Sequence, residues 1–310
     1  MPKIAFIFPA YNEEQTIADT LRTFHGEVPE AELWVIDNNS SDDTAKISKE
    51  TLSEIRAGGG VLFEKRQGKG NAVRKAFREI DADYYLISDA DLTYPAAQAR
   101  ELLAPVLAGD ADMTVGDRHA NGRYKSENKR TFHNFGNHLV LFLINTLFSS
   151  RLSDIMSGYR AFNRQFVKNY PILVEGFEIE TDMTLHALDK RFRIAELPID
   201  YKDRPEGSTS KLNTFHDGLR VIKTIINIFR YYKPLCFFGI LSLFFFLCGL
   251  VAAIPVLGDY IAHGYIYHVP LALLATGLEI VALLMLVVGL ILDQSSYYNK
   301  CNFERKLLDD

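Results

Sequence analysis

Residues 84–95 read YYLISDADLTYP, and this stretch decides the fold class. The apolar run Tyr84–Ile87 predicts a buried strand, which is followed by two carboxylates, Asp89 and Asp91. An unpaired charge in a low-dielectric site is costly, and two like charges at this spacing repel each other. The pair therefore needs a cation beside it, or the strand end opens to solvent and the two acids only form a turn.

Strand-like apolar runs alternate with helix-like amphipathic segments on both sides of this stretch. Such alternation is typical of βαβ units and predicts an α/β fold with a Rossmann-like, mostly parallel sheet. The predicted strands are Ile4–Phe8, Leu33–Ile36, Val61–Glu64, Tyr84–Ser88 and Met113–Val115, and the predicted helices between them are Glu13–His25, Ser41–Ile55, Gly68–Ile80 and Pro95–Ala108.

Three acids follow predicted strands, namely Asp37, Asp89 and Asp91. Open parallel sheets bind ligands at the carboxyl ends of their strands, so these acids fall where a ligand is expected. Carboxylates are hard ligands that suit Mg²⁺ or Mn²⁺, and Mg²⁺ is typically completed by substrate phosphates. The sequence has no G-x-G-x-x-G after the first strand and no P-loop, so it predicts a nucleoside diphosphate ligand of another class.

The composition of the chain excludes some classes of protein. The chain has 310 residues and a formal net charge of −5, which argues against a general nucleic-acid-binding protein. Its three cysteines are far apart and form neither a disulfide framework nor a zinc spacing. The first residues lead into a strand without a signal-peptide pattern, so we expect the polar region to stay in the cytoplasm.

The chain becomes strongly apolar after residue 234. Segments 235–257 and 269–292 are each over 20 residues long and nearly free of charge, and either can cross a ~30 Å hydrocarbon core. The connector 258–268 lacks Lys and Arg, whereas seven lie between Lys202 and Lys233. This bias predicts a multi-pass protein of the inner membrane with both termini, including the tail 293–310, in the cytoplasm. A core hairpin of a soluble protein is the alternative.

Three further features concern the membrane. Residues 213–234 form an amphipathic basic pattern that suits an interface with anionic lipids. Phe135–Phe148 is helical but too short to span, so it is either a buried helix or one resting on the membrane surface. Glu279 lies in the second span, where we expect it to be protonated or paired with a neighbouring helix.

The motifs together resemble those of family 2 (GT-A fold) glycosyltransferases, and most closely the polyprenyl-phosphate group with dolichyl-phosphate mannose synthase and bacterial two-helix undecaprenyl-phosphate glucosyltransferases. The resemblance covers residues 4–212, so we expect a glycosyltransferase domain over 1–212. The matching motifs are Pro9–Glu13, Asp37–Thr44, Gly68–Ala72, Asp89–Leu92, Gly116–Arg118, Ser153–Arg160 and Arg204–Leu212.

The resemblance implies roles for individual residues. Asp89 and Asp91 would serve the sugar donor and bind the metal, Mg²⁺ or Mn²⁺, with Asp91 as the direct ligand. Asp37 could instead cap the following helix, and Lys69 could be a solvated lysine. The residues implied to hold the nucleotide are Pro9, Tyr11, Glu13, Asp37, Lys69 and Asp89, and those implied to hold a lipid phosphate are Arg118, Arg130, Arg204 and Lys211, although solvated surface arginines are the alternative for the latter.

Asp154 is the remaining catalytic residue that the resemblance implies, as a base, an orienting group or a structural cap. Glu180 is weaker, because Glu178, Glu180 and Asp182 together can line a solvated face. The chain departs from the family pattern at two positions. Asn38 stands where a second acid is common, and Thr93 stands where glutamine is common.

We therefore expect inverting transfer of a sugar, with UDP-glucose as the first donor to consider and GDP-mannose as an alternative, onto undecaprenyl or a related polyprenyl phosphate. Self-association, as a tetramer, is also expected from the resemblance. One rival is transfer to a saccharide hydroxyl, but Trp34 is the only tryptophan and the Q-x-x-R-W motif of such synthases is absent. A non-catalytic membrane scaffold is the second rival.

Overall fold

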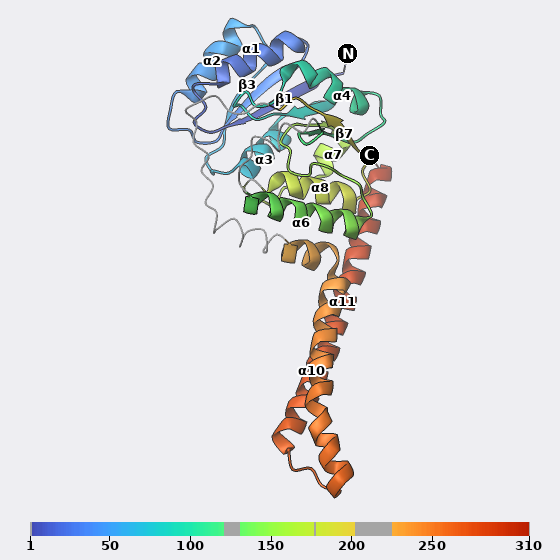
Figure 1. The fold of residues 1–310 in the computed structure, drawn as a ribbon. Coiled ribbons are helices and arrows are strands. Elements are labelled where there is room, and N and C mark those ends of the chain that lie inside the picture. Colours follow the sequence, from blue (N-terminus) through green and yellow to red (C-terminus); the bar gives the residue numbers. More distant parts are fainter. Residues whose placement is uncertain (1, 121–130, 177, 202–224, 310) are drawn as a thin grey trace. The chain divides into compact units, whose positions relative to one another are not determined.

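A computed structural model of the chain describes residues 2–120, 131–176, 178–201 and 225–309. The chain divides into two compact units, Met1–Asn213 and Thr214–Asp310. The first is an α/β unit and the second contains a long helical hairpin (Figure 1).

The first unit is built on a sheet that has seven strands within the described residues, in the order β3-β2-β1-β4-β6-β5-β7. Strand β6 is antiparallel to both of its neighbours, and all the other pairs are parallel. The predicted mostly parallel α/β fold is confirmed, although β6 and β7 were not predicted. The strands are β1 Ile4–Ala10, β2 Glu32–Asp37, β3 Gly59–Phe63, β4 Tyr84–Ile87, β5 Met113–Asp117, β6 Arg160–Asn163 and β7 Ile194–Pro198.

Helices cover both faces of this sheet. Helices α1, α2 and α4 lie on one side, and α3, α7 and α8 lie on the other (Figure 1). The bounds are α1 Ile17–Glu27, α2 Thr44–Glu54, α3 Lys69–Glu79, the 3₁₀ turn η1 Ala96–Gln98, α4 Ala99–Leu107, α6 Thr131–Phe148, α7 Arg164–Asn169 and α8 Ile179–Asp189.

Aromatic packing fixes the first helix on the sheet. The ring of Phe24 on α1 meets those of Phe6 and Phe8 on β1 edge to face, with centroids 5.8 and 5.1 Å apart. All three side chains are buried, as are Ile17 and Leu21 on the same helix face. This spacing of apolar residues along α1 is the amphipathic pattern that predicted the helix.

Helix α6 is not the fully buried helix of the first sequence alternative. Val140 and Ile144 are buried, whereas Phe142 between them is 64% exposed. The helix therefore buries one stripe and presents apolar side chains on another.

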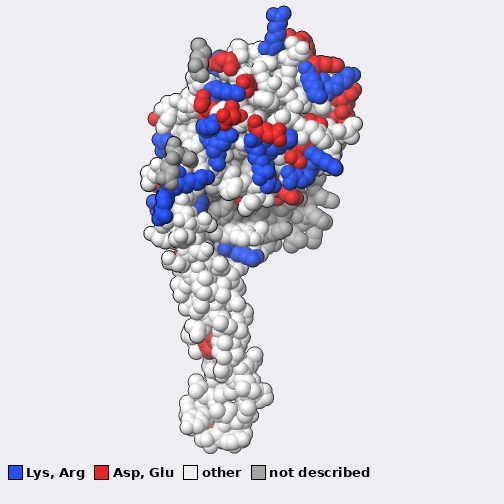
Figure 2. Space-filling view, turned by 180° about the vertical axis from the view of Figure 1, so that it is seen from behind, with Lys and Arg blue, Asp and Glu red and all other residues white. Residues whose placement is uncertain are grey.

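The second unit contains the two long helices α10 Pro234–His263 and α11 Val269–Asp309, which run side by side (Figure 1). Both are long and apolar enough to cross a membrane. The helix α11 continues through the predicted tail. In the face seen in Figure 2, charged side chains are dense on the first unit and sparse along the hairpin. Of the predicted interfacial helix 213–234, residues 225–234 are described, and 225–232 form a helix.

Small and polar side chains bring the two long helices together. The hydroxyl of Ser242 donates to the carbonyl of Ala282 at 2.7 Å. Gly249 faces Glu279 so closely that an added Cβ would lie 2.5 Å from its Oε1. That buried oxygen has no hydrogen-bond partner among the described residues. Of the two states expected for Glu279, protonated or paired, the described residues supply no partner to this oxygen for the paired one.

The start of α3 depends on a glycine. Gly68 has φ +128°, and a Cβ there would clash with the backbone carbonyl of Glu175. We expect Gly68→Ala to lower the free energy of unfolding by about 2–4 kcal/mol, because it adds backbone strain to an overpacked contact. Thermal unfolding of the full chain measures the effect. Gly26→Ala is the control, since nothing lies within 4 Å of a Cβ there, and an unchanged Gly68→Ala protein would contradict the packing described.

Candidate active site

The carboxyl edge of the sheet collects the candidate residues. Asp37 ends β2, Asp89 follows β4, and Arg118 follows β5. Because β6 is antiparallel, with Arg160 paired to Ile87, its first residue lies at this same edge. The loop 153–159, which precedes β6, is therefore brought to the edge where the acids stand.

A lysine places a cation beside Asp89, the first acid of the pair. The Nζ of Lys69, at the start of α3, lies 2.5 Å from Oδ1 of Asp89 and 2.6 Å from Oε1 of Glu180 on α8. Burial alone would lower the pKa of Lys69, but the carboxylates of Asp89 and Glu180 raise it above its ordinary value. The ammonium is thus charged and bridges two acids, and the solvated-lysine alternative is wrong.

The backbone of Gly158 covers this ion pair. A Cβ at Gly158 would lie 2.8 Å from Nζ of Lys69 and 3.2 Å from Oδ2 of Asp89. Its N–H donates to the hydroxyl of Tyr94 at 2.8 Å, and the Tyr94 ring stacks on Tyr159 with centroids 5.1 Å apart. A Cβ at this position would force these side chains to shift, so the loop 153–159 packs directly against the Lys69–Asp89 pair.

Asp91 is held by the residue that departs from the family pattern. The backbone N–H and the hydroxyl of Thr93 both donate to Oδ1 of Asp91, at 3.2 and 2.6 Å. Asp91 is only 3% exposed, and the intervening Leu92 adopts a left-handed conformation with φ 62°. Thr93 therefore orients the Asp91 carboxylate through a tight turn.

The residues expected to hold the nucleotide lie around the ends of β1 and β2. Pro9 and Asp37 belong to these two strands, which pair side by side, and Tyr11 and Glu13 follow β1. The Oδ1 of Asp37 accepts the N–H of Ser40 at 3.2 Å, whereas α2 begins only at Thr44. The alternative in which Asp37 caps this helix is therefore wrong.

The side chain of Asn38, next to Asp37, is hydrogen-bonded to the backbone of a neighbouring loop. Its amide donates to the carbonyls of Glu64 and Arg66, at 3.3 and 2.6 Å, and its Oδ1 accepts the N–H of Gly68 at 2.7 Å. The side chain thus fixes the loop that leads into α3. An amide can donate and accept at once, which an ionised acid at this position could not do.

The implied acceptor side is built around one ion pair. The Nε and Nη2 of Arg118 donate to Oδ2 and Oδ1 of Asp154, at 2.7 and 3.0 Å. The side chains of Arg118 and Asp154 are 12% and 2% exposed, so Arg118 is not a solvated surface arginine. Burial raises the pKa of Asp154, but the hydrogen bonds and charge of Arg118 outweigh it, and the net pKa lies below its ordinary value. Arg130, Arg204 and Lys211 lie outside the described residues.

Four residues that pattern reasoning undervalued or missed complete the site. Glu180 is buried rather than solvated, and Asp182 accepts the hydroxyl of Tyr170 at 2.6 Å, so only Glu178 of that trio is exposed. The guanidinium of Arg160, 1% exposed, donates to the carbonyls of Ser157 and Ile155, at 2.8 Å each. The four residues are Glu180, Tyr94, Arg160 and Glu196, and no common sequence pattern marks them.

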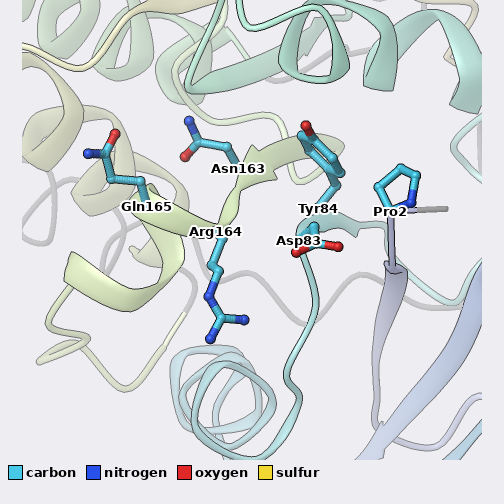
Figure 3. A pocket seen from close by; sticks show the side chains of 6 residues that line it. All are labelled: Pro2, Asp83, Tyr84, Asn163, Arg164 and Gln165. Carbon is cyan, nitrogen blue, oxygen red and sulfur yellow. The ribbon is translucent and has the colours of Figure 1, made fainter. Parts of the chain in front are cut away.

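A separate pocket lies at the opposite edge of the sheet. It is formed where β1 and β4 begin and β6 ends, and it contains none of the predicted site residues (Figure 3). We therefore assign it no role in the chemistry. The residues that line it are Pro2, Asp83, Tyr84, Asn163, Arg164 and Gln165.

Comparison with known proteins identifies the class. The family model "Glycosyl transferase family 2" matches residues 5–170, which is more than half of the chain. The chain belongs to this family, and the resemblance seen in its motifs is confirmed.

Individual relatives are similar to this chain over more of its length than the family model. Glycosyltransferase AglJ of Haloferax volcanii is 29% identical over 94% of this chain and 92% of its own length. The undecaprenyl-phosphate mannosyltransferase of Micrococcus luteus is 27% identical over 74% of this chain and 93% of its own. Glucosyl-3-phosphoglycerate synthase from Mycobacterium tuberculosis, solved with Mn²⁺, UDP and phosphoglyceric acid, has a TM-score of 0.57 at 19% identity and covers 74% of this chain and 78% of its own. This likeness shows the GT-A fold.

Proposed function

We propose that this glycosyltransferase moves a sugar from a nucleoside diphosphate sugar to the phosphate of a polyprenyl lipid at the membrane surface, with inversion at the sugar. The observation that carries the proposal is the loop 153–159. It brings Gly158 against the Lys69–Asp89 pair and Asp154 against Arg118. A donor-side acid and an acceptor-side cation are thus joined by one short segment.

The donor side suits a nucleotide with a divalent cation. Asp89 and Asp91 offer hard oxygen ligands, and the described residues contain no group of three or more metal-binding side chains. This fits Mg²⁺ or Mn²⁺ held by one or two carboxylates and completed by substrate phosphates. When bound, the cation would neutralise charge on the departing diphosphate. Asp91 would hold it, and Lys69 would place a further positive charge beside Asp89.

The acceptor side suits a phosphate. A phosphate monoester has a second pKa near ~6, so at neutral pH it is mostly dianionic and needs no base to become a nucleophile. Asp154 has a lowered pKa and both of its oxygens accept from Arg118, which supports an orienting role rather than proton abstraction. Arg118 would then meet the phosphate, together with Arg130, Arg204 and Lys211.

The helical hairpin would anchor the enzyme. Helices α10 and α11 would be membrane spans, with the active site and both termini in the cytoplasm, as the distribution of Lys and Arg predicts. The acceptor could then stay in the bilayer and present only its phosphate. The proposal includes self-association of the protein as a homotetramer.

The test is transfer of labelled sugar into a lipid extract. Purified protein would receive undecaprenyl phosphate, Mg²⁺ or Mn²⁺, and a panel that begins with UDP-glucose and includes UDP-N-acetylhexosamines and GDP-mannose. We expect label from one donor to enter the lipid phase and to be lost with chelator. Label that appears only when a saccharide is added would support the hydroxyl-acceptor alternative and overturn the proposal.

Arg118→Lys should lower the rate of transfer to the lipid phosphate by about 10- to 100-fold. Lysine keeps the charge, but it cannot donate to both oxygens of Asp154 at once. The pair therefore loses its bidentate hydrogen bonding. Steady-state kinetics with varied lipid measures the loss. Arg193→Lys is the matched control, because Arg193 forms a similar fork with Asp112 at the other end of β5, with Nη2 3.0 Å from Oδ1. Equal losses in both variants would show that the effect is general destabilisation.

A further inference from the structure

Glu196 lies on β7, at the position paired with Val115 of β5. Strand β5 ends at Asp117 and is followed by Arg118. Glu196 therefore stands beside the strand that carries the acceptor-side arginine. It belongs to none of the groups implied to touch the nucleotide, the metal or the lipid phosphate.

The carboxylate of Glu196 holds the start of the loop 153–159. The N–H of Ser153 lies 2.8 Å from both Oε1 and Oε2 of Glu196, and the N–H of Asp154 donates to Oε1 at 2.9 Å. Two successive backbone donors thus converge on one carboxylate. Because a Glu side chain that is ionised only accepts hydrogen bonds, its charge matches this arrangement.

The next residue of the chain of contacts is Asp154 itself. With its backbone fixed by Glu196, its carboxylate accepts from Nε and Nη2 of Arg118 and from the N–H of Met156 at 3.1 Å. The direction of the Asp154 side chain, and hence of the Arg118 guanidinium, depends on where the loop begins.

We propose that Glu196 is a positioning residue for the acceptor phosphate: its carboxylate fixes the backbone of Ser153 and Asp154 so that Asp154 aims Arg118 at the acceptor. This inference rests on the proposed function. It assigns Glu196 no contact with the substrate.

The surroundings of Glu196 favour its protonated form over its ionised form. Burial raises the pKa of Glu196, Asp117 and Asp154 raise it further, and the N–H groups of Asp154 and Ser153 only partly oppose them. For a group whose pKa is raised by folding, the stabilisation is present at low pH and is lost as pH rises through the folded-state pKa. The ionised form of Glu196 is therefore less favourable for folding than its protonated form would be.

The experiment compares Glu196→Gln with the wild type in full-length protein. We expect kcat/KM for undecaprenyl phosphate to fall by roughly 10- to 100-fold, as for a small misplacement of a reacting group, with KM for the nucleotide sugar unchanged. We expect the unfolding temperature to stay within about 4 °C of the wild type. Hydrogen exchange at the amides of Ser153 and Asp154 should become faster.

A double-mutant cycle tests whether Glu196 acts through Asp154. Asp154→Asn combined with Glu196→Gln should lose no more activity than the more damaging single variant, because both changes break the same chain of contacts. Additive losses would overturn the inference, as would wild-type lipid kinetics in Glu196→Gln.

Asp112→Asn is the matched control. Asp112 is also a buried carboxylate that accepts a backbone N–H, from Arg193 at 2.8 Å, but it stands at the opposite end of β5. We expect it to lower stability without changing the ratio of KM for lipid to KM for donor. If the wild type transfers no sugar to lipid phosphate, the proposed function fails. The hydrogen-exchange comparison then still decides whether Glu196 fixes the loop, since unchanged exchange would overturn that part.

Discussion

Replacing Asp91 by asparagine should lower the rate of sugar transfer by about 10³-fold or more while the protein stays folded. Asparagine keeps the size of the side chain and can still accept the hydrogen bonds that Thr93 donates to Oδ1. It removes the negative charge that would hold the divalent cation at the diphosphate. Stabilising the charge of the leaving group is commonly the largest single contribution to such catalysis.

Donor turnover at saturating metal measures this effect, and thermal unfolding checks the fold. Asp83→Asn is the matched control, because Asp83 precedes β4 whereas Asp91 follows it, and its Oδ2 only accepts the N–H of Lys3 at 2.8 Å. Asp91→Asn protein that keeps even a tenth of wild-type transfer would contradict the role given to Asp91.

Replacing Lys69 by methionine should have the second largest effect. It leaves the buried carboxylate of Glu180 and the half-buried carboxylate of Asp89 without the cation that lies 2.6 and 2.5 Å from them. Removing one partner of a buried ion pair typically costs about 3–5 kcal/mol. We expect a clear fall in unfolding temperature together with a loss of transfer of at least about 10²-fold.

A second substitution separates these two effects. Glu180→Gln added to Lys69→Met removes one of the two unpaired charges, so it should restore part of the stability but none of the transfer. Lys75→Met on the same helix is the control, because its ion pair with Glu79 is solvent-exposed and such pairs contribute about 1 kcal/mol or less. A stable Lys69→Met variant would show that the bridge is not a stabilising contact.

Local patterns predicted most of the sheet. The first five strands and the helices between them were found because each combines an apolar run with turn residues and a change of period. The same logic located Asp37, Asp89 and Asp91 at one edge, since the carboxyl ends of parallel strands meet there. The roles of these residues in binding and catalysis remain predictions.

Two strands were missed for physical reasons. Strand β6 is only four residues long and begins with Arg160, which reads as a surface residue until three carbonyl and hydroxyl oxygens are found around its guanidinium. Strand β7 contains Glu196 and ends at Pro198, so it lacks the alternation of apolar and polar residues. Both strands depend on tertiary contacts rather than on local preference.

The observed start of helix α2 differs from the predicted one, also because of tertiary contacts. Helix α2 was predicted from Ser41 but begins at Thr44. The carboxylate of Asp42 accepts from the N–H of Thr44 at 3.1 Å, and the amide oxygen of Asn12 accepts the N–H of Ser41 at 2.8 Å. These contacts hold the segment before α2 as a turn that joins the β1 and β2 loops.

The charged pairs of the site were also beyond the reach of local patterns. Lys69 and Glu180 are far apart in the sequence, and so are Arg118 and Asp154, which the segment containing α6 separates. The sequence indicated either a cation beside the acids or a solvent-exposed turn, and it did not indicate which residue would supply a cation. Pairing of this kind appears only when the topology places α3, α8 and the loop 153–159 at the same edge.

The acceptor is the central claim, and one comparison tests it most directly. Purified protein with its donor and metal would receive undecaprenyl phosphate in one reaction and undecaprenol in another, with label in the lipid extract as the readout. The account predicts label only with the phosphate, because in the proposal Arg118 meets a dianion and Asp154 orients Arg118 instead of acting as a base. Label entering undecaprenol at a similar rate would contradict it.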